Sequence, residues 1–163
     1  MKHYSLIIVL LMCGFCFSCR PVEDEDHHYI ISFYNNSEAD LYVVDDVNYP
    51  DTILRYSGFL HYPEIYKVKA HSLNRDGLKQ ERTTYEQAFS SYKGYKTIKN
   101  DTLIVFVLDA EKLEKNGFPV MDALLVRYDL SLQDLQRMNW SIAYPLQENM
   151  KSIKMWPKNH SPQ

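Results

Sequence analysis

Cysteine is scarce in this sequence, and its three copies, Cys13, Cys16 and Cys19, all lie within the first nineteen residues. If the chain is cut just before Cys19, a single cysteine remains. A disulfide framework, a zinc site with cysteine ligands and a cysteine nucleophile are then all excluded. The stability of the protein has to come from an ordinary hydrophobic core, and about 130 residues are enough for one such domain.

Motifs of the common enzyme classes are also missing. The sequence has five glycines, which form no phosphate-binding loop, and the HExxH and GxSxG patterns are absent. We therefore expect no catalysis, no cofactor and no bound metal. A small hydrolase that uses two carboxylates is kept as an alternative, because a sequence cannot show two acidic residues facing each other across a cleft. The histidines that follow Cys19 are scattered: His27, His28, His61, His71 and His160.

Basic residues are outnumbered by acidic ones. The chain has 18 Lys and Arg against 21 Asp and Glu, a net charge of -3. Removal of Lys2 with the amino-terminal segment would make the balance more acidic by one charge. A mildly acidic chain without a basic patch is a poor candidate for binding nucleic acid, so we expect no nucleic-acid partner.

The clearest structural pattern lies between Leu124 and Pro145. Residues Leu124–Leu130 are rich in branched and aromatic side chains, which predicts a buried strand. Ser131 and Asp134 have the spacing of a capping box, which predicts that a short helix begins after Ser131. Apolar and polar residues then alternate from Trp140 to Tyr144, which predicts a second strand. Trp140 itself is expected to pack in the core between these elements.

Other elements are predicted along the chain by similar patterns. The apolar run Thr102–Leu108 predicts a central strand that is buried on both faces. Thr84 and Gln87 form a second capping box at the start of a helix over Thr84–Tyr92. Further predictions are a hairpin of Tyr29–Tyr34 with Leu41–Val44, a short strand over Tyr66–Ala70, a turn at Asn74–Gly77, and a helix over Ala110–Asn116 that is capped by Asp109.

Together these elements predict an α+β fold with a mainly antiparallel sheet and about three short helices. The alternative is a β-sandwich with helical decorations. We expect one globular domain over residues 29–145. Residues 146–163 are expected to form a partly docked tail, held by the apolar side chains Ile153, Met155 and Trp156.

The stretch RYDLSLQDLQRMNWSIAYP (residues 127–145), with NDTLIVFVLDAEKLE upstream and IKMWP at the end, resembles a group of small lipoproteins of the Bacteroidales. The similarity covers roughly residues 28 to 157. It implies an envelope location in that group of bacteria. It implies no activity, ligand or catalytic residue.

The amino-terminal segment predicts export and lipidation. Lys2 and His3 precede an apolar run from Tyr4 to Phe17, which is too short for a stable membrane span and is typical of a secretory signal. A small residue, Ser18, precedes Cys19, as processing of bacterial lipoproteins requires. We therefore expect residues 1–18 to be a signal peptide and Cys19 to be lipidated and held in the membrane. A plain signal peptide or a retained anchor helix are the alternatives.

Residues 19–28 are predicted to form an acidic tether. The run Glu23-Asp24-Glu25-Asp26 is expected to stay extended and solvated, because neighbouring carboxylates repel one another. This run resembles the surface-export signal of Bacteroidetes lipoproteins, which implies a location on the outside of the outer membrane. The alternative is a charged linker with the domain facing the periplasm.

Aromatic side chains are concentrated between Tyr49 and Tyr66, the least regular part of the chain. On a loop such rings can stack on sugar faces while their hydroxyls form hydrogen bonds. The alternative is that they cover a small core. The candidate ligand contacts are Tyr49, Tyr56, Phe59 and Tyr62.

Two tripeptides, Asp51-Thr52-Ile53 and Asp101-Thr102-Leu103, resemble the protein O-glycosylation motif of Bacteroidetes. Because the second opens a buried strand, only Thr52 is a candidate for glycosylation.

The sequence therefore predicts a non-catalytic, lipid-anchored protein of the outer membrane that binds a glycan or a protein partner. The alternative function is that of a structural or assembly accessory in an outer-membrane complex.

Overall fold

The computed structural model of the chain describes residues 23–51, 53–54, 57–90, 97–116 and 119–157. The predicted signal peptide, Cys19, Thr52 and Tyr56 lie outside these ranges. Within them, no helix has the length and apolar character needed to cross a membrane.

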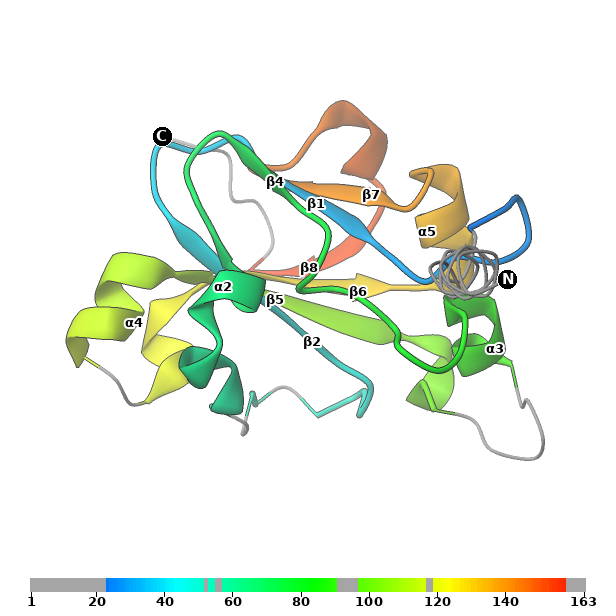
Figure 1. The fold of residues 1–163 in the computed structure, drawn as a ribbon, viewed down its shortest axis with the longest axis horizontal. Helices are drawn as coiled ribbons and strands as arrows, with labels where there is room; N and C mark the ends of the chain where they lie inside the picture. Colours follow the sequence, from blue (N-terminus) through cyan, green and yellow to red (C-terminus); the bar gives the residue numbers. More distant parts are fainter. Residues whose placement is uncertain (1–22, 52, 55–56, 91–96, 117–118, 158–163) are drawn as a thin grey trace, which may run out of the picture.

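The described residues form two sheets and several short helices (Figure 1). The smaller sheet has the strand order β4-β1-β7 and the larger one has the order β3-β2-β5-β6-β8. The strands are β1 (Ser32–Asn35), β2 (Leu41–Asp46), β3 (Lys67–Val68), β4 (Ser72–Asn74), β5 (Leu103–Asp109), β6 (Leu124–Leu130), β7 (Ser141–Tyr144) and β8 (Lys154–Trp156). The α-helices are α2 (Pro63–Tyr66), α3 (Tyr85–Phe89), α4 (Ala110–Asn116) and α5 (Leu132–Arg137), and short 3-10 turns are η2 (Gly58–His61), η4 (Lys99–Asp101), η5 (Val120–Ala123) and η6 (Glu148–Met150).

These elements confirm the predicted α+β class. Most strand pairs are antiparallel, and β1 with β7 is a parallel pair. Within the described residues there are four short α-helices: the three predicted ones, which begin at residues 85, 110 and 132, and in addition α2. The larger difference is that the strands divide between two sheets.

Strand β5 lies at the centre of the larger sheet, and its two faces contribute to two separate cores. Leu103, Val105 and Val107 belong to the inner core, which lies between the two sheets. Ile104 and Phe106 belong to the outer core on the opposite face. The predicted strand that is buried on both faces is therefore confirmed.

Different layers cover the two faces of the larger sheet. On the inner side, Phe33 and Ile142 of the smaller sheet pack into the same core as Phe89 of α3 and Leu135 of α5. On the outer side, the cover comes from η2, α4 and η5 through residues such as Phe59 and Leu113. Figure 1 shows β1 and β7 running above β5 and β6, with α4 at the far end of the molecule from α3 and α5.

Local side-chain signals set the helix starts where the sequence predicted them. Thr84 accepts from the amide of Gln87 and Ser131 accepts from the amide of Asp134, so both capping boxes are present. Helix α3 ends at Phe89, and residues 91 and 92 of the predicted helix lie outside the described ranges. The carboxylate of Asp109 accepts from the amide of Lys112 at 2.9 Å and caps α4.

The predicted hairpin of Tyr29–Tyr34 with Leu41–Val44 is wrong. Strand β1 pairs with β4 and β7, while β2 pairs with β3 and β5 in the other sheet. The connection is held by Asn35, which is fully buried. Its side-chain amide donates to the carbonyls of Ala39, Val68 and Lys69 at 2.7–3.2 Å. These bonds fix the chain as it passes from one sheet to the other, so β1 and β2 do not fold back on each other.

The end of the chain contributes to the larger sheet. Strand β8 pairs antiparallel with β6, so that Trp156 lies beside Arg127 and Lys154 lies beside Asp129. Just before β8, Ile153 is buried in the inner core. The predicted apolar cluster of the tail therefore docks as the edge strand of the sheet.

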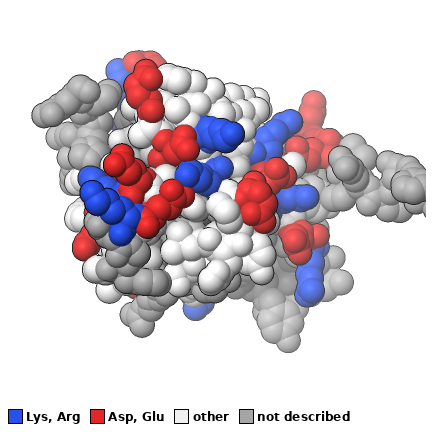
Figure 2. Space-filling model, turned by 60° about the vertical axis from the view of Figure 1, so that its left-hand side comes forward, with Lys and Arg blue, Asp and Glu red and all other residues white. Residues whose placement is uncertain are grey.

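Charges of both signs are intermixed on the surface. In Figure 2, where the left side of Figure 1 comes forward, Lys and Arg side chains lie between Asp and Glu side chains. Some of these charges form ion pairs between elements: Lys67 of β3 lies 2.8 Å from Glu114 of α4. The face shown offers no broad basic area of the kind that binds a phosphate backbone.

Asp45 places a carboxylate on the inner face of β2, next to the residues that build the inner core. It follows Leu41 and Val43 at the two-residue period of a strand, and both of these are inner-core residues. Desolvation by burial, with a smaller contribution from the neighbouring charge of Asp46, raises the pKa of Asp45 from 3.8 to about 6. The ionised form of Asp45 is therefore unfavourable in the folded protein.

Replacement of Asp45 by Asn is expected to stabilise the protein at neutral pH. Between about pH 4 and pH 6 the carboxyl has ionised in the unfolded chain but not in the folded one, so wild-type stability falls across this window. The full shift corresponds to about 3 kcal/mol. Because Asp45 keeps partial exposure, we expect a gain on the order of 1–2 kcal/mol above pH 7 and none near pH 3.5.

The measurement is urea unfolding of the wild type and the Asp45→Asn variant at several pH values. Asp76→Asn is the control, because Asp76 is an exposed residue. A difference between wild type and Asp45→Asn that does not change with pH would contradict the assignment.

Candidate binding groove

The outer face of the larger sheet carries charged residues at the end where β6 and β8 pair. Because cross-strand partners share a face, Arg127 lies between Phe106 and Trp156, and Asp129 lies between Ile104 and Lys154. Each of these two cross-strand rows begins on β5, in the outer core. On β8 the rows reach solvent: the exposed fraction of Trp156 is 56%.

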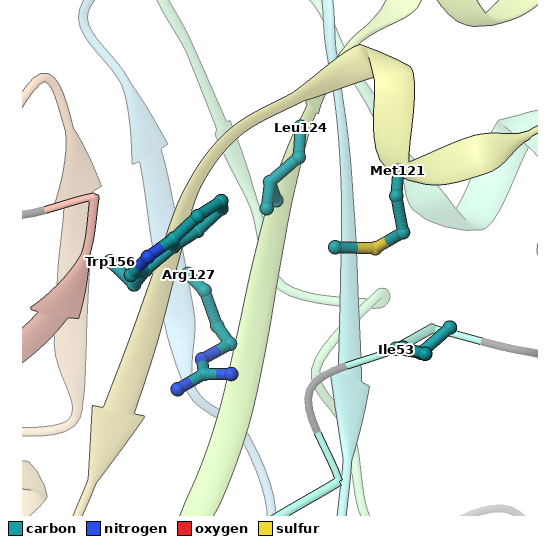
Figure 3. A pocket seen from close by; sticks show the side chains of 5 residues that line it. All are labelled: Ile53, Met121, Leu124, Arg127 and Trp156. Atoms are coloured by element: carbon teal, nitrogen blue, oxygen red, sulfur yellow. The ribbon is translucent and has the colours of Figure 1, made fainter.

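A groove of about 500 Å³ lies over this part of the sheet. Figure 3 shows Trp156 on one side, Ile53 and Met121 on the other, and the guanidinium of Arg127 in the space between Trp156 and Ile53. The lining residues come from four segments of the chain: Ile53, Met121 of η5, Leu124 and Arg127 of β6, and Trp156 of β8.

The groove combines two exposed apolar side chains at its rim with a buried charge in its floor. Ile53 is 52% exposed, and Trp156 is similarly exposed, whereas the residue Arg127 is only 8% exposed. Exposed large apolar side chains that gather in a concave place mark interaction sites more often than isolated ones do. This groove, defined by Ile53, Met121, Leu124, Arg127 and Trp156, is therefore the candidate functional site.

The charge in the floor is part of a group of three ionised side chains. Nε of Arg127 lies 2.8 Å from one carboxylate oxygen of Asp129, and Nη2 donates to the other oxygen at 3.0 Å. Nζ of Lys154 lies 3.3 Å from the same carboxylate. One carboxylate is thus shared by two cations.

Lys154 connects this group to Tyr49. Its ammonium donates to the hydroxyl of Tyr49 at 2.6 Å and lies 5.0 Å from the centre of the Tyr49 ring. Hydrogen bonds to Tyr49 and to Asp129 raise the pKa of Lys154, so its positive charge is kept at neutral pH. Tyr49 is partly buried and also packs against the outer core.

The predicted ligand contacts have different surroundings in the structure. Phe59 is 1% exposed and packs between Tyr42 and Tyr66, so it belongs to the core. Tyr62 is 51% exposed but does not line the groove. Tyr49 lies beside the groove floor through Lys154, while Tyr56 and Thr52 fall outside the described residues. The core interpretation therefore holds for Phe59, and ligand contact by Tyr49, Tyr56 and Tyr62 stays a prediction.

Sequence reasoning missed Arg127 and Trp156 as site residues. One signal was available, since Arg127 and Asp129 place two charges at a two-residue spacing inside an otherwise apolar strand. Such a pair indicates that one face of the strand is not entirely covered by core. Trp156 was identified only as a docking residue of the tail, and nothing in its neighbourhood indicated that it meets Ile53.

The acidic segment before the domain is not extended over its described part. The carboxylate of Glu23 accepts from the amides of Tyr29 and Ile30 at 3.1 and 2.9 Å. Asp24 accepts from the amide of Asp26 and lies 2.7 Å from Nδ1 of His27. These bonds offset the repulsion between carboxylates that predicted an extended tether, and they fold the segment into a turn.

His28 joins this turn to the domain. Its ring stacks on Trp140 at a centroid distance of 4.3 Å, and its Nδ1 lies 2.6 Å from the carboxylate of Glu86. Trp140 is buried in the inner core, as predicted. The two adjacent histidines thus have separate acidic partners, and among the described residues no three His, Asp or Glu side chains gather as metal ligands would.

No protein-family model matches the chain, and no curated protein or solved structure shows significant similarity to it.

Proposed function

We propose that the protein is a non-catalytic, lipid-anchored protein of the cell envelope whose groove binds a partner protein. The observation that carries the proposal is the exposed rim of Trp156 and Ile53 above the buried charge of Arg127. Trp and Arg are the residues that most often dominate the binding energy of protein interfaces. An apolar rim of this kind is stabilised when a partner covers it.

The groove lining favours a polypeptide over a glycan. Of its five lining residues within the described part of the chain, Ile53, Met121 and Leu124 offer apolar contacts and no hydrogen-bonding groups in their side chains. Such a lining suits an apolar side chain, whereas a sugar needs several polar groups around it. Glycan binding by stacking on Trp156 is the second candidate, because Trp156 presents an exposed ring beside a guanidinium.

The groove gives little support to a carboxylate hydrolase. No carboxylate is among the described residues that line the groove, and that of Asp129, which contacts Arg127, has both oxygens facing cations. Mechanisms with two carboxylates need a second acidic residue across the scissile bond.

Anchoring is supported by the amino-terminal sequence. The short apolar segment and the Ser18-Cys19 pair favour lipidation at Cys19, and bacterial lipidation adds more than one acyl chain, which makes a stable anchor. The proposed location is the outer membrane with the domain on the cell surface. A periplasmic orientation, with a role as an accessory of an outer-membrane complex, is the alternative.

Photo-crosslinking in intact cells tests this function. A photo-reactive amino acid in place of Ile53 is expected to give one covalent product with an envelope protein, identified by mass spectrometry. Trp156→Ala is expected to lower the yield at least tenfold, because a central aromatic anchor contributes about 2 kcal/mol or more to binding. Cys19→Ser is expected to remove the chain from the membrane fraction and to abolish the product.

Leu73 provides the matched control position. It is 47% exposed but belongs to β4 in the other sheet. The same product from both positions, or a product that is insensitive to Trp156→Ala, would rule out the groove as the binding site. A product that contains polysaccharide would support the glycan candidate, and a nearly stoichiometric product would support the accessory role. Digestion of the product by protease added to intact cells would place it on the surface.

A further inference from the structure

We infer that the groove selects an extended partner segment that carries an acidic side chain two or three residues away from its apolar anchor. This inference rests on the proposed function, because it names the chemistry of the polypeptide that the groove would bind.

The charge balance around Arg127 favours an acidic ligand group. Arg127 and Lys154 supply two positive charges and Asp129 supplies one negative charge, all within contact distance. The nearest further carboxylate along this row is that of Asp46, which is separated from Asp129 by β5 and therefore lies about 10 Å away. At that distance salt screens much of its effect on an exposed group. The group of Arg127, Asp129 and Lys154 therefore has an excess positive charge, which an acidic ligand group beside Arg127 would neutralise.

The direction of the Arg127 side chain also favours an anionic ligand group. Its Nε and Nη2 contact the carboxylate of Asp129. The remaining amino group, Nη1, therefore lies on the side of the guanidinium that faces away from that carboxylate. Arg127 lines the groove, and its side chain is only 10% exposed. A ligand anion that contacts Arg127 would therefore be partly desolvated. Hydrogen bonds to charged groups are stronger there than on an open surface.

The spacing between the charged and the apolar parts of the groove sets the spacing of the ligand's side chains. Leu124 and Arg127 are three residues apart in β6, which corresponds to about 10 Å along a strand. Figure 3 shows the guanidinium pointing away from Leu124 and Met121. A ligand that reaches both ends has to separate its apolar and acidic groups by two or three extended residues. The carboxylate of a carboxyl-terminal apolar residue lies too close to its own side chain.

Capped pentapeptides test the inference directly. The series is acetyl-Ala-Phe-Ala-Glu-Ala-amide, its Gln and Lys counterparts at the fourth position, and acetyl-Ala-Ala-Phe with a free carboxyl group. Each is titrated into the lipidated full mature chain in nanodiscs of zwitterionic lipid, so that the membrane adds no net charge. The observable is the NMR signal of the indole N–H of Trp156, and the chain's other tryptophan, Trp140, is the internal control because it is buried.

The Glu peptide is expected to bind about five- to tenfold more tightly than the Gln peptide, and the Lys peptide more weakly than both. This preference is expected to shrink as the salt concentration rises. In the variant Arg127→Gln with Asp129→Asn and Lys154→Gln, which removes all three charges, the Glu and Gln peptides are expected to bind within twofold of each other. An unchanged Trp140 signal shows that this variant is folded.

Equal binding of the three pentapeptides at Trp156 would overturn the inference while leaving the groove a polypeptide site. A preference for the free-carboxyl peptide would assign the charge to a carboxyl terminus and would also overturn it. If no peptide changes the Trp156 signal but Ile53 still crosslinks to a partner in cells, the inference fails and the proposed function stands. If both experiments fail, the groove is not a protein-binding site.

Discussion

Replacement of Phe59 by Ala is expected to lower the free energy of unfolding by about 3–4 kcal/mol. Phe59 is 1% exposed, and its ring centre lies 5.7 Å from that of Tyr42 and 6.2 Å from that of Tyr66. The substitution removes a large apolar side chain from the outer core and leaves a cavity between η2 and β2. Urea unfolding followed by circular dichroism measures the loss.

Tyr62→Ala is the matched control from the same aromatic segment. Tyr62 follows η2 and is 51% exposed, so its removal is expected to cost less than about 1 kcal/mol. The contrast separates the two interpretations of this segment residue by residue. Small losses for both variants would mean that η2 is not an integral part of the core.

Arg127→Met is expected to cost about 3 kcal/mol, because it leaves the carboxylate of Asp129 buried without its main partner. The side chain of Asp129 is only 2% exposed. Lys154 remains 3.3 Å away, which holds the expected loss at the lower end of the range for broken buried ion pairs. The measurement is the midpoint and slope of urea unfolding, which separate a change in stability from a change in compactness.

The double variant Arg127→Met with Asp129→Leu is expected to recover most of this stability. Replacing both partners removes the cost of desolvating charges, and apolar side chains of similar size can fill the same space. Lys112→Met is the control for an exposed pair: Lys112 lies 3.9 Å from Asp109 and is largely solvated, so little change is expected. A double variant that is as unstable as Arg127→Met would show that shape, and not charge, sets the cost.

If the double variant is as stable as the wild type, the ion pair contributes little net stability to this fold. The presence of the Arg127–Asp129 pair on a partly covered face of β6 would then support a role in recognition. The stability series and the peptide titration therefore test the same residues by independent observables.

Local features of this fold were predictable from sequence, and long-range pairing was not. The two capping boxes, at Thr84 and Ser131, involve residues three positions apart, so the sequence contains the whole interaction. The run of β5 was predictable because burial on both faces requires continuous apolar residues. A capping box depends only on residues that are close in the chain. The strand β5 requires only that apolar residues cover it, whichever residues these are.

The choice of sheet for β1 depended on contacts that a local pattern does not contain. A turn-rich hexapeptide between two apolar runs is typical of a hairpin, but Asn35 binds carbonyls more than thirty residues away. Likewise, the groove needs Ile53 and Trp156 to meet across about a hundred residues of chain. Residue types at these positions were visible, and their proximity was not.

The parallel pairing of β1 with β7 has a consequence for the timing of folding. Ser32 pairs with Ser141, so the smaller sheet joins strands from near the two ends of the described chain. Contacts of such large sequence separation form slowly, because a long loop has to close before they are gained. If the chain is exported from its amino terminus, as proposed, it cannot complete this sheet until nearly all of it has crossed the membrane. The topology itself would then keep the emerging polypeptide from folding prematurely.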